Sequence, residues 1–486
     1  MAREATVPRI ELPAWPPVVL SAALGFALAF AIVLYPLPGM AAPVAVGALL
    51  LASRQPQWLM LAFFTSLAIP IQRSLAGVPV NAADALLVLW CVLWPLMMQR
   101  EGAPPLSRWR LPPLVLLIAP FLASVIVSQL GSINPGASLK QVFRLVEWFV
   151  VLPLVLTVFV PDPRFRRFAG VMLMVVPCVF AIDGIVEYFS NGRTLTGMIG
   201  IPVPVPEGGA GQIRHTYDVS GRAGSSFGGA QGLAMYLVMT MGFAIAHLLY
   251  PPAPWMRRLA IPCLLISIGG LAVAQSRGGV MGALALVLAM ALLVRARLRL
   301  PFVLASAFLL ALALVGLGLW PAWDGTIAGL VPGGRPEAVL DRLIIWGVVR
   351  DVMLDNPFFG VGLGNFRDAF FAREPWLHVE LAYQSLHAHN TYLEILADTG
   401  WVGLCAYLAF LIGAVRRLVR QWSLGGQPAL TLAAVGSLAA YAVFAMVDML
   451  LLQNMHLLLV LVLSIGLAQL DEAKRGTGPV AARASP

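Results

Sequence analysis

The residues best suited to chemistry lie in one short segment of the chain. His387-Ala388-His389-Asn390 contains two of the six histidines among 486 residues. Thr391, followed three residues later by Glu394, has the pattern of a capping box, which predicts that a helix begins here. His389 then lies just before a helix N-terminus, where the helix dipole disfavours a protonated imidazole. We therefore expect a neutral His389 that can accept a proton; the alternative is a polar loop histidine with no role in chemistry.

Three arginines form the second candidate set. Arg222 stands in a glycine- and serine-rich stretch just ahead of an apolar segment, and Arg277 stands in a tight turn between two such segments. Arg342 lies in a long polar interval. The planar guanidinium group suits phosphate oxygens, so arginines that converge outside a membrane would suit a diphosphate. The alternative is that each arginine snorkels or forms a local salt bridge.

Composition defines the class of protein. Hydrophobic residues make up 59% of the chain and charged residues 11%, and the mean hydropathy is +0.85. A soluble fold cannot cover so much apolar surface, so the sequence predicts an all-α protein that crosses a membrane many times. The net charge of +9 does not indicate nucleic-acid binding, because the basic residues are spread in small clusters between the apolar segments.

The apolar segments and the basic clusters give a topology. Candidate spans lie near 16–35, 40–52, 58–71, 85–98, 112–130, 145–160, 168–189, 226–250, 259–275, 279–294, 301–319, 401–415, 429–447 and 453–470. These are about fourteen spans, or about twelve if short early ones merge. Alternate connections carry the basic clusters, which places both termini in the cytoplasm.

The same pattern divides the chain into four parts. Residues 1–319 form an N-terminal transmembrane bundle with an outer loop near 190–225, and residues 320–400 form a large outer loop subdomain. Residues 401–470 form the last transmembrane helices, and 471–486 a cytoplasmic tail. The two long connections fall on the side opposite the basic clusters, so we expect any site that they build to face away from the cytoplasm.

The large outer loop contains one predicted helix and one glycine-rich turn. Residues 337–355 alternate at helical period, with Leu340, Ile344, Val348 and Val352 as the apolar stripe of a helix on the membrane surface or over a cavity. The segment from Asn356 to Phe366 follows as a turn-rich linker, whose glycines leave the backbone free to approach a ligand.

The glycines beyond the histidines have a separate use. Leu393, Leu396, Gly400 and Gly403 recur at helical spacing after the histidine segment. Glycines on one helix face allow a neighbouring helix to approach closely, so Gly400 and Gly403 predict close helix packing.

Several classes of chemistry find no support in the sequence. The four cysteines lie in apolar segments without metal-ligand spacing. The sequence has no His-x-x-x-His or Glu-x-x-His helix, and no Asp-x-Asp pair on the outer side, to indicate a metal site. Nor does a glycine-rich loop with Lys-Ser/Thr indicate nucleotide binding. Asp351 and Asp355 share a helix face that we expect to be solvated. Asp183, Glu187 and Asp448 lie within or at the ends of spans, where they mark either ion paths or local pairing.

These residues resemble a known family. His389-Asn390, nine residues, and Gly400-Trp401-Val402-Gly403 are similar to the His-[Asn/Ser/Gln]-x9-Gly-x-x-[Gly/Thr/Tyr] pattern of O-antigen ligases. The Ser276-Arg277-Gly278 turn and the Pro357-to-Phe366 segment resemble recurring features of the same superfamily. That superfamily also holds O-antigen polymerases and protein O-oligosaccharyltransferases. The resemblance covers most of the chain from about residue 120 onward and implies about twelve spans in a GT-C-like fold.

The resemblance implies an activity. Family members work at the periplasmic face of the bacterial inner membrane, where they move a polysaccharide from undecaprenyl diphosphate to a sugar hydroxyl of lipid A–core. They need no metal, nucleotide or other cofactor. The family's essential histidine corresponds to His389 and its diphosphate-binding arginines to Arg222 and Arg277, with Arg342 matched less clearly. His387, Asn390, Gly400 and Gly403 would then support the site.

Other activities stay open at this stage. A polymerase would use a second carrier-linked repeat unit as the acceptor, and a protein glycosyltransferase would use a serine or threonine. A lipid-linked sugar transporter would require ionisable residues near the middle of the membrane and a repeat of two halves. The sequence has no such repeat, and its polar residues concentrate in the outer loops.

Overall fold

The apolar segments fold as helices, since backbone groups within a lipid bilayer must satisfy their hydrogen bonds internally. The computed structural model describes residues 56–66, 72–75, 78–98, 111–157, 159–160, 162–190, 192–195, 222–227, 229–294, 336–373, 387–424, 428–448 and 455–467. The α-helices are α3 (Pro56–Ser66), α4 (Ala82–Met98), α5 (Pro113–Ser128), α6 (Pro135–Val146), α7 (Leu152–Leu156), α8 (Pro163–Phe189), α10 (Ala230–Leu249), α11 (Pro254–Ala274), α12 (Arg277–Val294), α14 (Pro336–Asp355), α15 (Phe366–Arg373), α16 (Thr391–Ser423), α17 (Pro428–Phe444) and α18 (Met455–Leu467). Short turns of other helix types are η2 (Gln129–Gly131), η3 (Glu147–Val151) and η4 (Ser225–Phe227).

Six of these helices are long and apolar enough to cross a membrane. They are α5 extended by η2, α8, α10, α11, α12 and α16, while α17 and α18 are shorter apolar helices. The prediction of a polytopic helical membrane protein is therefore confirmed. The spans predicted near 16–35, 40–52 and 301–319 lie outside the described residues, so the total of about twelve stays a prediction.

The described residues also include one pair of short strands beside the helices. Strand β1 (Gln72–Leu75) pairs antiparallel with β2 (Val78–Asn81), with Gln72 opposite Asn81. Only Ala76 and Gly77 separate the two strands, a spacing that suits a tight hairpin. A hairpin this short escapes an analysis of long apolar segments, since it carries no apolar run of spanning length.

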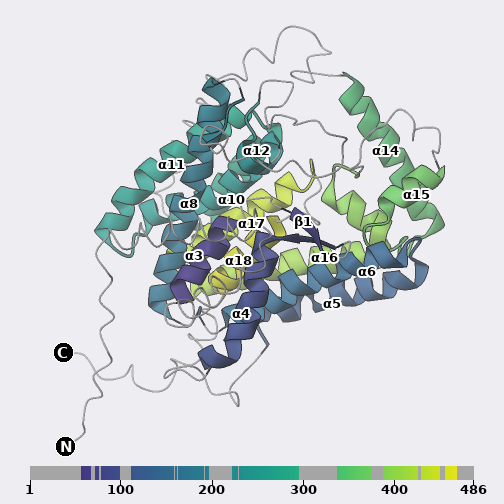
Figure 1. Ribbon diagram of the computed structural model, residues 1–486, viewed down its shortest axis with the longest axis horizontal. Helices are drawn as coiled ribbons and strands as arrows, with labels where there is room; N and C mark the ends of the chain where they lie inside the picture. Colours follow the sequence, from purple (N-terminus) through teal and green to yellow (C-terminus); the bar gives the residue numbers. More distant parts are fainter. Residues whose placement is uncertain are drawn as a thin grey trace, which may run out of the picture.

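The helices divide into two groups that meet at α17 (Figure 1). Helices α8, α10, α11 and α12 pack together, and α10 and α12 both contact α17. In the other group α5 lies along α16, while α14 contacts both α15 and α16. Because α16 also packs against α17, the start of α16 and the end of α17 lie where the two groups join.

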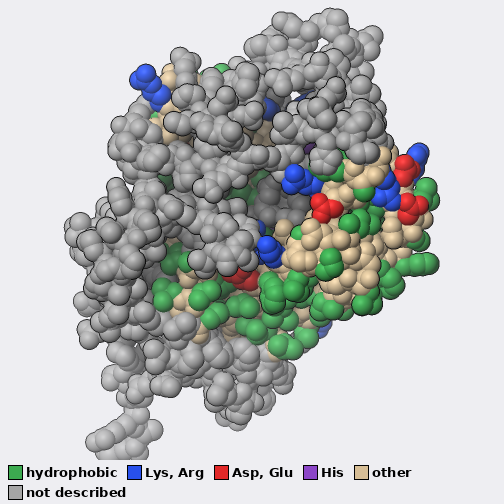
Figure 2. All heavy atoms as spheres, turned by 45° about the vertical axis from the view of Figure 1, so that its right-hand side comes forward, with side chains coloured by type: hydrophobic (Ala, Val, Ile, Leu, Met, Phe, Trp, Pro, Cys, Tyr) green, Lys and Arg blue, Asp and Glu red, His purple; other side chains and the backbone are tan. Residues whose placement is uncertain are grey.

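The described surface separates apolar from charged side chains. In Figure 2, hydrophobic side chains cover much of the lower part of the described surface, and acidic and basic side chains gather at its upper right. Exposed apolar side chains on α5 and α16 include Leu116, Ile126, Ile412 and Val419. An exposed apolar belt on long helices suits contact with lipid tails.

The helix α14 of the large loop turns a different face inward from the one predicted. Val348 and Val352 are buried as expected, but Ile344 is 41% exposed, and Ile345 and Val349 are buried instead. These four buried side chains pack with α15 and the start of α16 in a small core of their own. Because α14 packs against both α15 and α16, its buried face is wider than the predicted four-residue stripe and is shifted toward Ile345 and Val349.

The glycine-rich turn after α14 interlocks with α16. Gly400 breaks that helix with a φ of 67° and a ψ of −170°. Across the break, Trp401 N–H donates to Pro357 O (2.8 Å), and Val361 N–H and Gly362 N–H donate to Ala397 O (3.1 Å) and Asp398 O (2.9 Å). The turn therefore supplies the backbone partners that the broken helix lacks.

Gly400 was predicted to allow close helix packing, and the structure shows which backbone atoms approach it. A Cβ there would collide with the backbone of Phe358, and a Cβ on Gly360 would collide with the backbone of Asp398. The close approach is therefore between a helix and a turn, backbone against backbone. Gly403 lies one turn further on, where a Cβ would overlap the Thr399 side chain.

We predict that Gly400→Ala strongly destabilises the protein. An alanine must adopt a left-handed backbone and displace the Phe358 backbone, which together cost several kcal/mol, about 3 or more. The measurement is the melting temperature of the purified protein in detergent. Gly347→Ala on α14 is the matched control, because a Cβ there has nothing within 4 Å and a helical alanine is favourable. Equal melting temperatures for the two variants would contradict the interlock.

Candidate active site

The helix after the histidine segment begins at Thr391 as predicted, but the predicted cap is wrong. Asn390 is the N-cap residue, and its side-chain oxygen accepts from Tyr392 N–H (3.0 Å) and Leu393 N–H (3.1 Å). Thr391 turns away and donates its hydroxyl to Asp448 O (2.8 Å). The motif's asparagine therefore ends the loop and starts the helix, which gives it a structural reason to follow the histidine.

The backbone between the two histidines is held from two sides. Trp346 Nε1 on α14 donates to Ala388 O (2.9 Å), and the buried Glu394 carboxylate accepts from Ala388 N–H. Thus Glu394 reaches back as a capping-box glutamate would, but to a residue outside the helix. His389 adopts a φ of 49°, an uncommon backbone for histidine that these contacts maintain.

The two imidazoles lie against each other. Their ring centroids are 4.1 Å apart, and His389 N–H donates to His387 Nδ1 (3.2 Å). Burial, reinforced by His389, lowers the pKa of His387 to about 4, and Arg342 acts in the same direction while Asp448 opposes it. His387 is therefore neutral at neutral pH, and the hydrogen bond fixes its orientation beside His389.

The turn after α17 contacts two elements that carry candidate residues, the start of α16 and α14. Thr391 N–H donates to Ala445 O (2.8 Å), and Asn390 Nδ2 donates to Met446 O (3.0 Å). Arg342 Nη2 reaches Val447 O (3.5 Å). We call residues 445–448 the hub turn, since it bonds to the start of α16 and to α14.

Arg277 lies next to the hub turn. It is the first residue of α12, after a turn in which Gln275 caps α11 with a φ of 48°. The next residue, Gly278, packs so closely on the hub turn that a Cβ would lie 2.8 Å from Val447 Cγ2. The tight turn predicted around Arg277 is therefore present, and the glycine after it brings α12 against residues that also hold α16.

Two of the candidate arginines, Arg222 and Arg342, lie near enough to the third, Arg277, to act on it electrostatically. The positive charges of Arg342 and Arg222 act on the guanidinium of Arg277, and Arg342 also acts on His387. Within the described part of the chain, no carboxylate lies within ion-pair distance of Arg277. Three neighbouring guanidinium groups, of which one has no such partner, favour an anionic ligand.

Asp448 completes this cluster beside the histidine. Its carboxylate lies 3.9 Å from His389 Nδ1, and the side chain of Asp448 is 9% exposed whereas that of His389 is 37% exposed. The members of what we call the polar cluster are Arg222, Arg277, Arg342, His387, His389 and Asp448. A carboxylate on Nδ1 would leave Nε2 of His389 as the ring nitrogen that accepts a proton.

Part of the polar cluster has the composition of a metal site. His387, His389 and Asp448 each offer one ligand atom, and these atoms lie within 4.8 Å of one another. Sequence spacing did not reveal this group, because Asp448 comes from a different helix end. The positive charge of Arg342 acts on His387 and opposes a cation there.

Sequence reasoning missed Asp398 as a residue of the site's framework. This buried carboxylate in α16 accepts from Gly364 N–H (2.6 Å) and Phe366 N–H (2.9 Å). It therefore ties the glycine-rich turn to the helix that follows the histidines. A signal was present, since Asp398 follows Glu394 by one helical turn and so lies on the same face.

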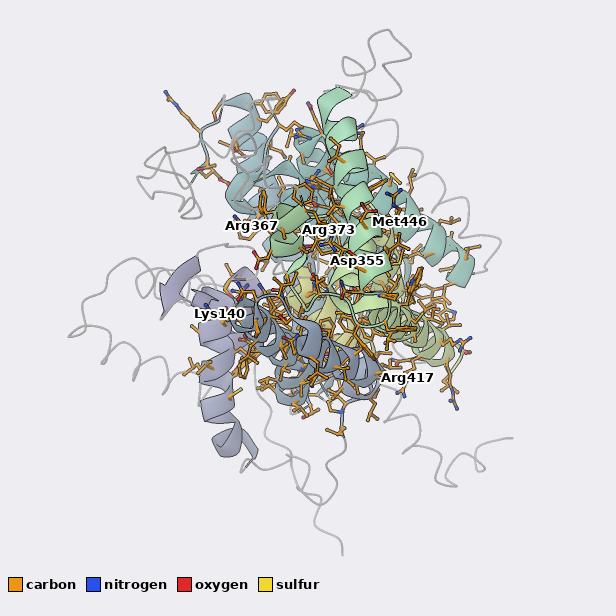
Figure 3. All side chains as sticks on the ribbon, turned by 90° about the vertical axis from the view of Figure 1, so that its right-hand side faces the viewer. Lys140, Asp355, Arg367, Arg373, Arg417 and Met446 are labelled. Atoms are coloured by element: carbon orange, nitrogen blue, oxygen red, sulfur yellow. The ribbon has the colours of Figure 1, made fainter. Side chains whose placement is uncertain are left out.

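The two acidic residues predicted on one face of α14 have local partners. Asp355 pairs with Arg373 (2.5 Å) and Asp351 with Arg350 (2.8 Å) on the surface of α14, as expected for a solvated face. Figure 3 shows Asp355, Arg367 and Arg373 close together, with Arg417 of α16 well apart from them. The charged groups of the large loop and those near the end of α16 therefore lie in different parts of the molecule.

Comparison with known proteins agrees with the histidine motif. The Wzy_C family model, described as O-Antigen ligase, matches residues 262–408. No curated protein matches the chain. The matched segment contains Arg277, Arg342 and the histidine motif, whereas Arg222 and Asp448 lie outside it. Residues 262–408 therefore form a domain that matches the O-antigen ligase family, the same family that the histidine motif resembles.

Proposed function

We propose that this protein transfers O-antigen polysaccharide from undecaprenyl diphosphate to a sugar hydroxyl of lipid A–core. The observation that carries the proposal is the polar cluster, in which guanidinium groups suited to a diphosphate lie beside a partly exposed imidazole. The family match supports a glycan-transferring membrane enzyme. The proposal adds the donor, the acceptor and the roles of the residues.

In the proposed reaction His389 acts as the general base. The acceptor hydroxyl oxygen forms a bond to the anomeric carbon of the glycan while the bond from that carbon to the diphosphate oxygen breaks. His389 takes the hydroxyl proton and later releases it to water. Asp448 beside Nδ1 would stabilise the imidazolium formed, although their 3.9 Å separation must shorten, as such contacts often do once substrate binds.

The arginines act on the leaving group. Undecaprenyl diphosphate gains negative charge as it leaves, and Arg222 and Arg277, with Arg342 beside them, would stabilise that charge. His387 stays neutral because its pKa lies near 4, so it adds no charge to the site. The hydrogen bond that it accepts from the His389 backbone is the contact through which His387 would support His389.

The proposed location is the bacterial inner membrane, with both termini in the cytoplasm and the polar cluster facing the periplasm. The basic clusters of the sequence support this orientation. The basic cluster of Arg416, Arg417 and Arg420 belongs to the end of α16, whereas the histidines precede its beginning. Because α16 is broken at Gly400, its continuous part runs from Trp401 to Ser423, and at about 1.5 Å per residue this part is long enough to cross a hydrocarbon core of about 30 Å.

The test of function is transfer by the purified protein in detergent or liposomes. The assay supplies polysaccharide on undecaprenyl diphosphate together with lipid A–core, without ATP or an ion gradient. Formation of lipid A–core carrying the polysaccharide supports the proposal. Elongation of carrier-linked repeat units would assign a polymerase instead, and modification of serine or threonine on a protein would assign a protein glycosyltransferase. No transfer, with movement of the intact carrier lipid, would assign a transporter.

We predict that transfer is unaffected by a metal chelator. The mechanism uses a free nitrogen of His389, and an ion bound to the His387, His389 and Asp448 group would occupy the same residues. The rate is measured before and after dialysis against EDTA and after addition of Zn²⁺ or Mg²⁺. Loss of transfer in EDTA with recovery on adding a metal would contradict the general-base role and favour a metal centre.

A further inference from the structure

Two buried carboxylates on α8 take no part in the proposed reaction. Asp183 is 5% exposed and Glu187 is fully buried. They are four residues apart, so they share one face of the helix, one turn from each other. A buried carboxylate is costly unless hydrogen-bond donors satisfy it, so each of these groups requires an explanation.

Both carboxylates bind the segment that follows Arg222. The Glu187 side chain accepts from Gly224 N–H (2.9 Å) and Ser225 N–H (2.6 Å). The Asp183 side chain accepts from the Ser225 hydroxyl (2.6 Å). These partners belong to the connection between α8 and α10, so the contacts favour local pairing over an ion path through the membrane.

Asp183 also binds the other end of the same connection. Its second oxygen accepts from Leu195 N–H (2.7 Å). One side chain thus holds the chain where it leaves α8 and where it returns before α10. The carboxylates of Asp183 and Glu187 together form what we call the loop clamp.

The clamped segment has little freedom to adopt another position. Ser225 is fully buried with a φ of 50°, and a Cβ on Gly224 would lie 2.9 Å from Gly229 N. On the opposite side, Ala223 N–H donates to Val273 O (3.2 Å) in α11. That helix leads through a two-residue turn to Arg277. The position of Arg222 relative to Arg277 is therefore set by α8 and α11 together.

We infer that Asp183 and Glu187 are positioning residues for donor binding, which act through Arg222. This inference rests on the proposed function, because it gives Arg222 the task of holding the diphosphate. A guanidinium group grips a phosphate well only in a defined geometry. The loop clamp fixes the backbone two and three residues beyond Arg222 with charge-assisted hydrogen bonds, which are stronger than neutral ones.

The test is a double-mutant cycle on the binding of undecaprenyl diphosphate to the purified full chain. The variants are Glu187→Ala, Arg222→Ala and the two combined, with the dissociation constant of each measured in detergent. We expect Glu187→Ala to weaken binding about tenfold. In the Arg222→Ala background the same change should have almost no further effect, because the residue through which it acts is absent.

Two further variants protect the test against misfolding. Glu187→Gln keeps the size of the side chain and one acceptor oxygen, and should weaken binding less than Glu187→Ala. Asp162→Ala is the control, because Asp162 caps the opposite end of the same helix through Arg164 N–H (2.8 Å) and should leave binding unchanged. The binding of a variant is measured only if the purified protein elutes as a single monodisperse peak in size-exclusion chromatography, as the original protein does.

The outcomes separate the two claims. If Arg222→Ala binds the lipid like the original protein, the proposed role of Arg222 fails and the loop clamp loses its purpose. If Arg222→Ala weakens binding while both Glu187 variants bind normally, only the inference is overturned. It is also overturned if Glu187→Ala weakens binding equally in the presence and absence of Arg222, because the effect would then be a general loss of structure.

Discussion

Replacing His389 with alanine will lower the rate of glycan transfer by about 10²–10⁴-fold, the usual contribution of a general base. Donor affinity should change little, because the proposed mechanism assigns the diphosphate to the arginines rather than to the imidazole. The rate is measured with saturating donor and acceptor on purified protein. His389→Gln should be equally inactive, since glutamine can form hydrogen bonds but cannot take up a proton at neutral pH.

Folding is the main competing explanation for such a loss. His389 has a strained backbone. It follows Ala388, whose carbonyl is held by Trp346, and precedes Asn390, the N-cap of α16. Its replacement could therefore loosen the loop. The melting temperature of His389→Gln therefore accompanies the rate. Asp351→Asn on the exposed face of α14 serves as a control for mutation of the large loop. Normal transfer by a stably folded His389→Gln protein would rule out the general base.

Replacing Arg277 with lysine will reduce transfer by about 10²–10³-fold, as expected when an electrostatic donor to the leaving group is lost. The charge is kept, but an ammonium group cannot reproduce a planar, two-pronged grip on phosphate oxygens. The dissociation constant for undecaprenyl diphosphate should rise at the same time, which separates this variant from His389→Gln. Both the transfer rate and the lipid affinity are measured.

A surface arginine provides the matched comparison. Arg350→Lys on α14 alters a solvent-exposed residue that pairs with Asp351, and exposed pairs contribute little. Its transfer rate and lipid affinity should match those of the unaltered protein. If Arg277→Lys behaves like Arg350→Lys, Arg277 is a structural charge at the start of α12 and not a donor ligand.

The sequence was most informative where a helix begins or ends at a residue with a local reason to do so. Thr391 starts α16, and Arg277 starts α12 after a tight turn, as predicted. Such boundaries depend on neighbouring residues along the chain, which a sequence displays directly. The long apolar segments became helices for an equally local reason, the need to satisfy backbone hydrogen bonds in lipid.

The sequence was less informative where contacts join distant segments. The hub turn binds α14 and the start of α16, yet residues 445–448 show nothing unusual apart from Asp448 at the end of an apolar segment. Asp398 gains its role from Gly364 and Phe366, more than thirty positions away. Pairings at such separations follow from the packing of whole helices, which periodicity along one helix does not contain.

The glycine-rich turn shows how the two kinds of information combine. Its glycines predicted a flexible backbone free to approach a ligand. In the structure Gly360, Gly362 and Gly364 have φ values of 66°, 94° and 77°, and the turn approaches α16 instead. The conformational freedom was visible in the sequence, but its partner was not. The partner is α16, the helix that follows His389, so the turn helps to hold the helix next to the histidine in place.

The central claim is that the arginines of the polar cluster hold a diphosphate next to His389. Its most direct test is an experimental structure of the protein bound to undecaprenyl diphosphate. We expect the phosphate oxygens within hydrogen-bond distance of Arg222 and Arg277, with Nε2 of His389 facing the position of the departing sugar. A diphosphate bound elsewhere, or a His389 ring turned away from it, would contradict the claim.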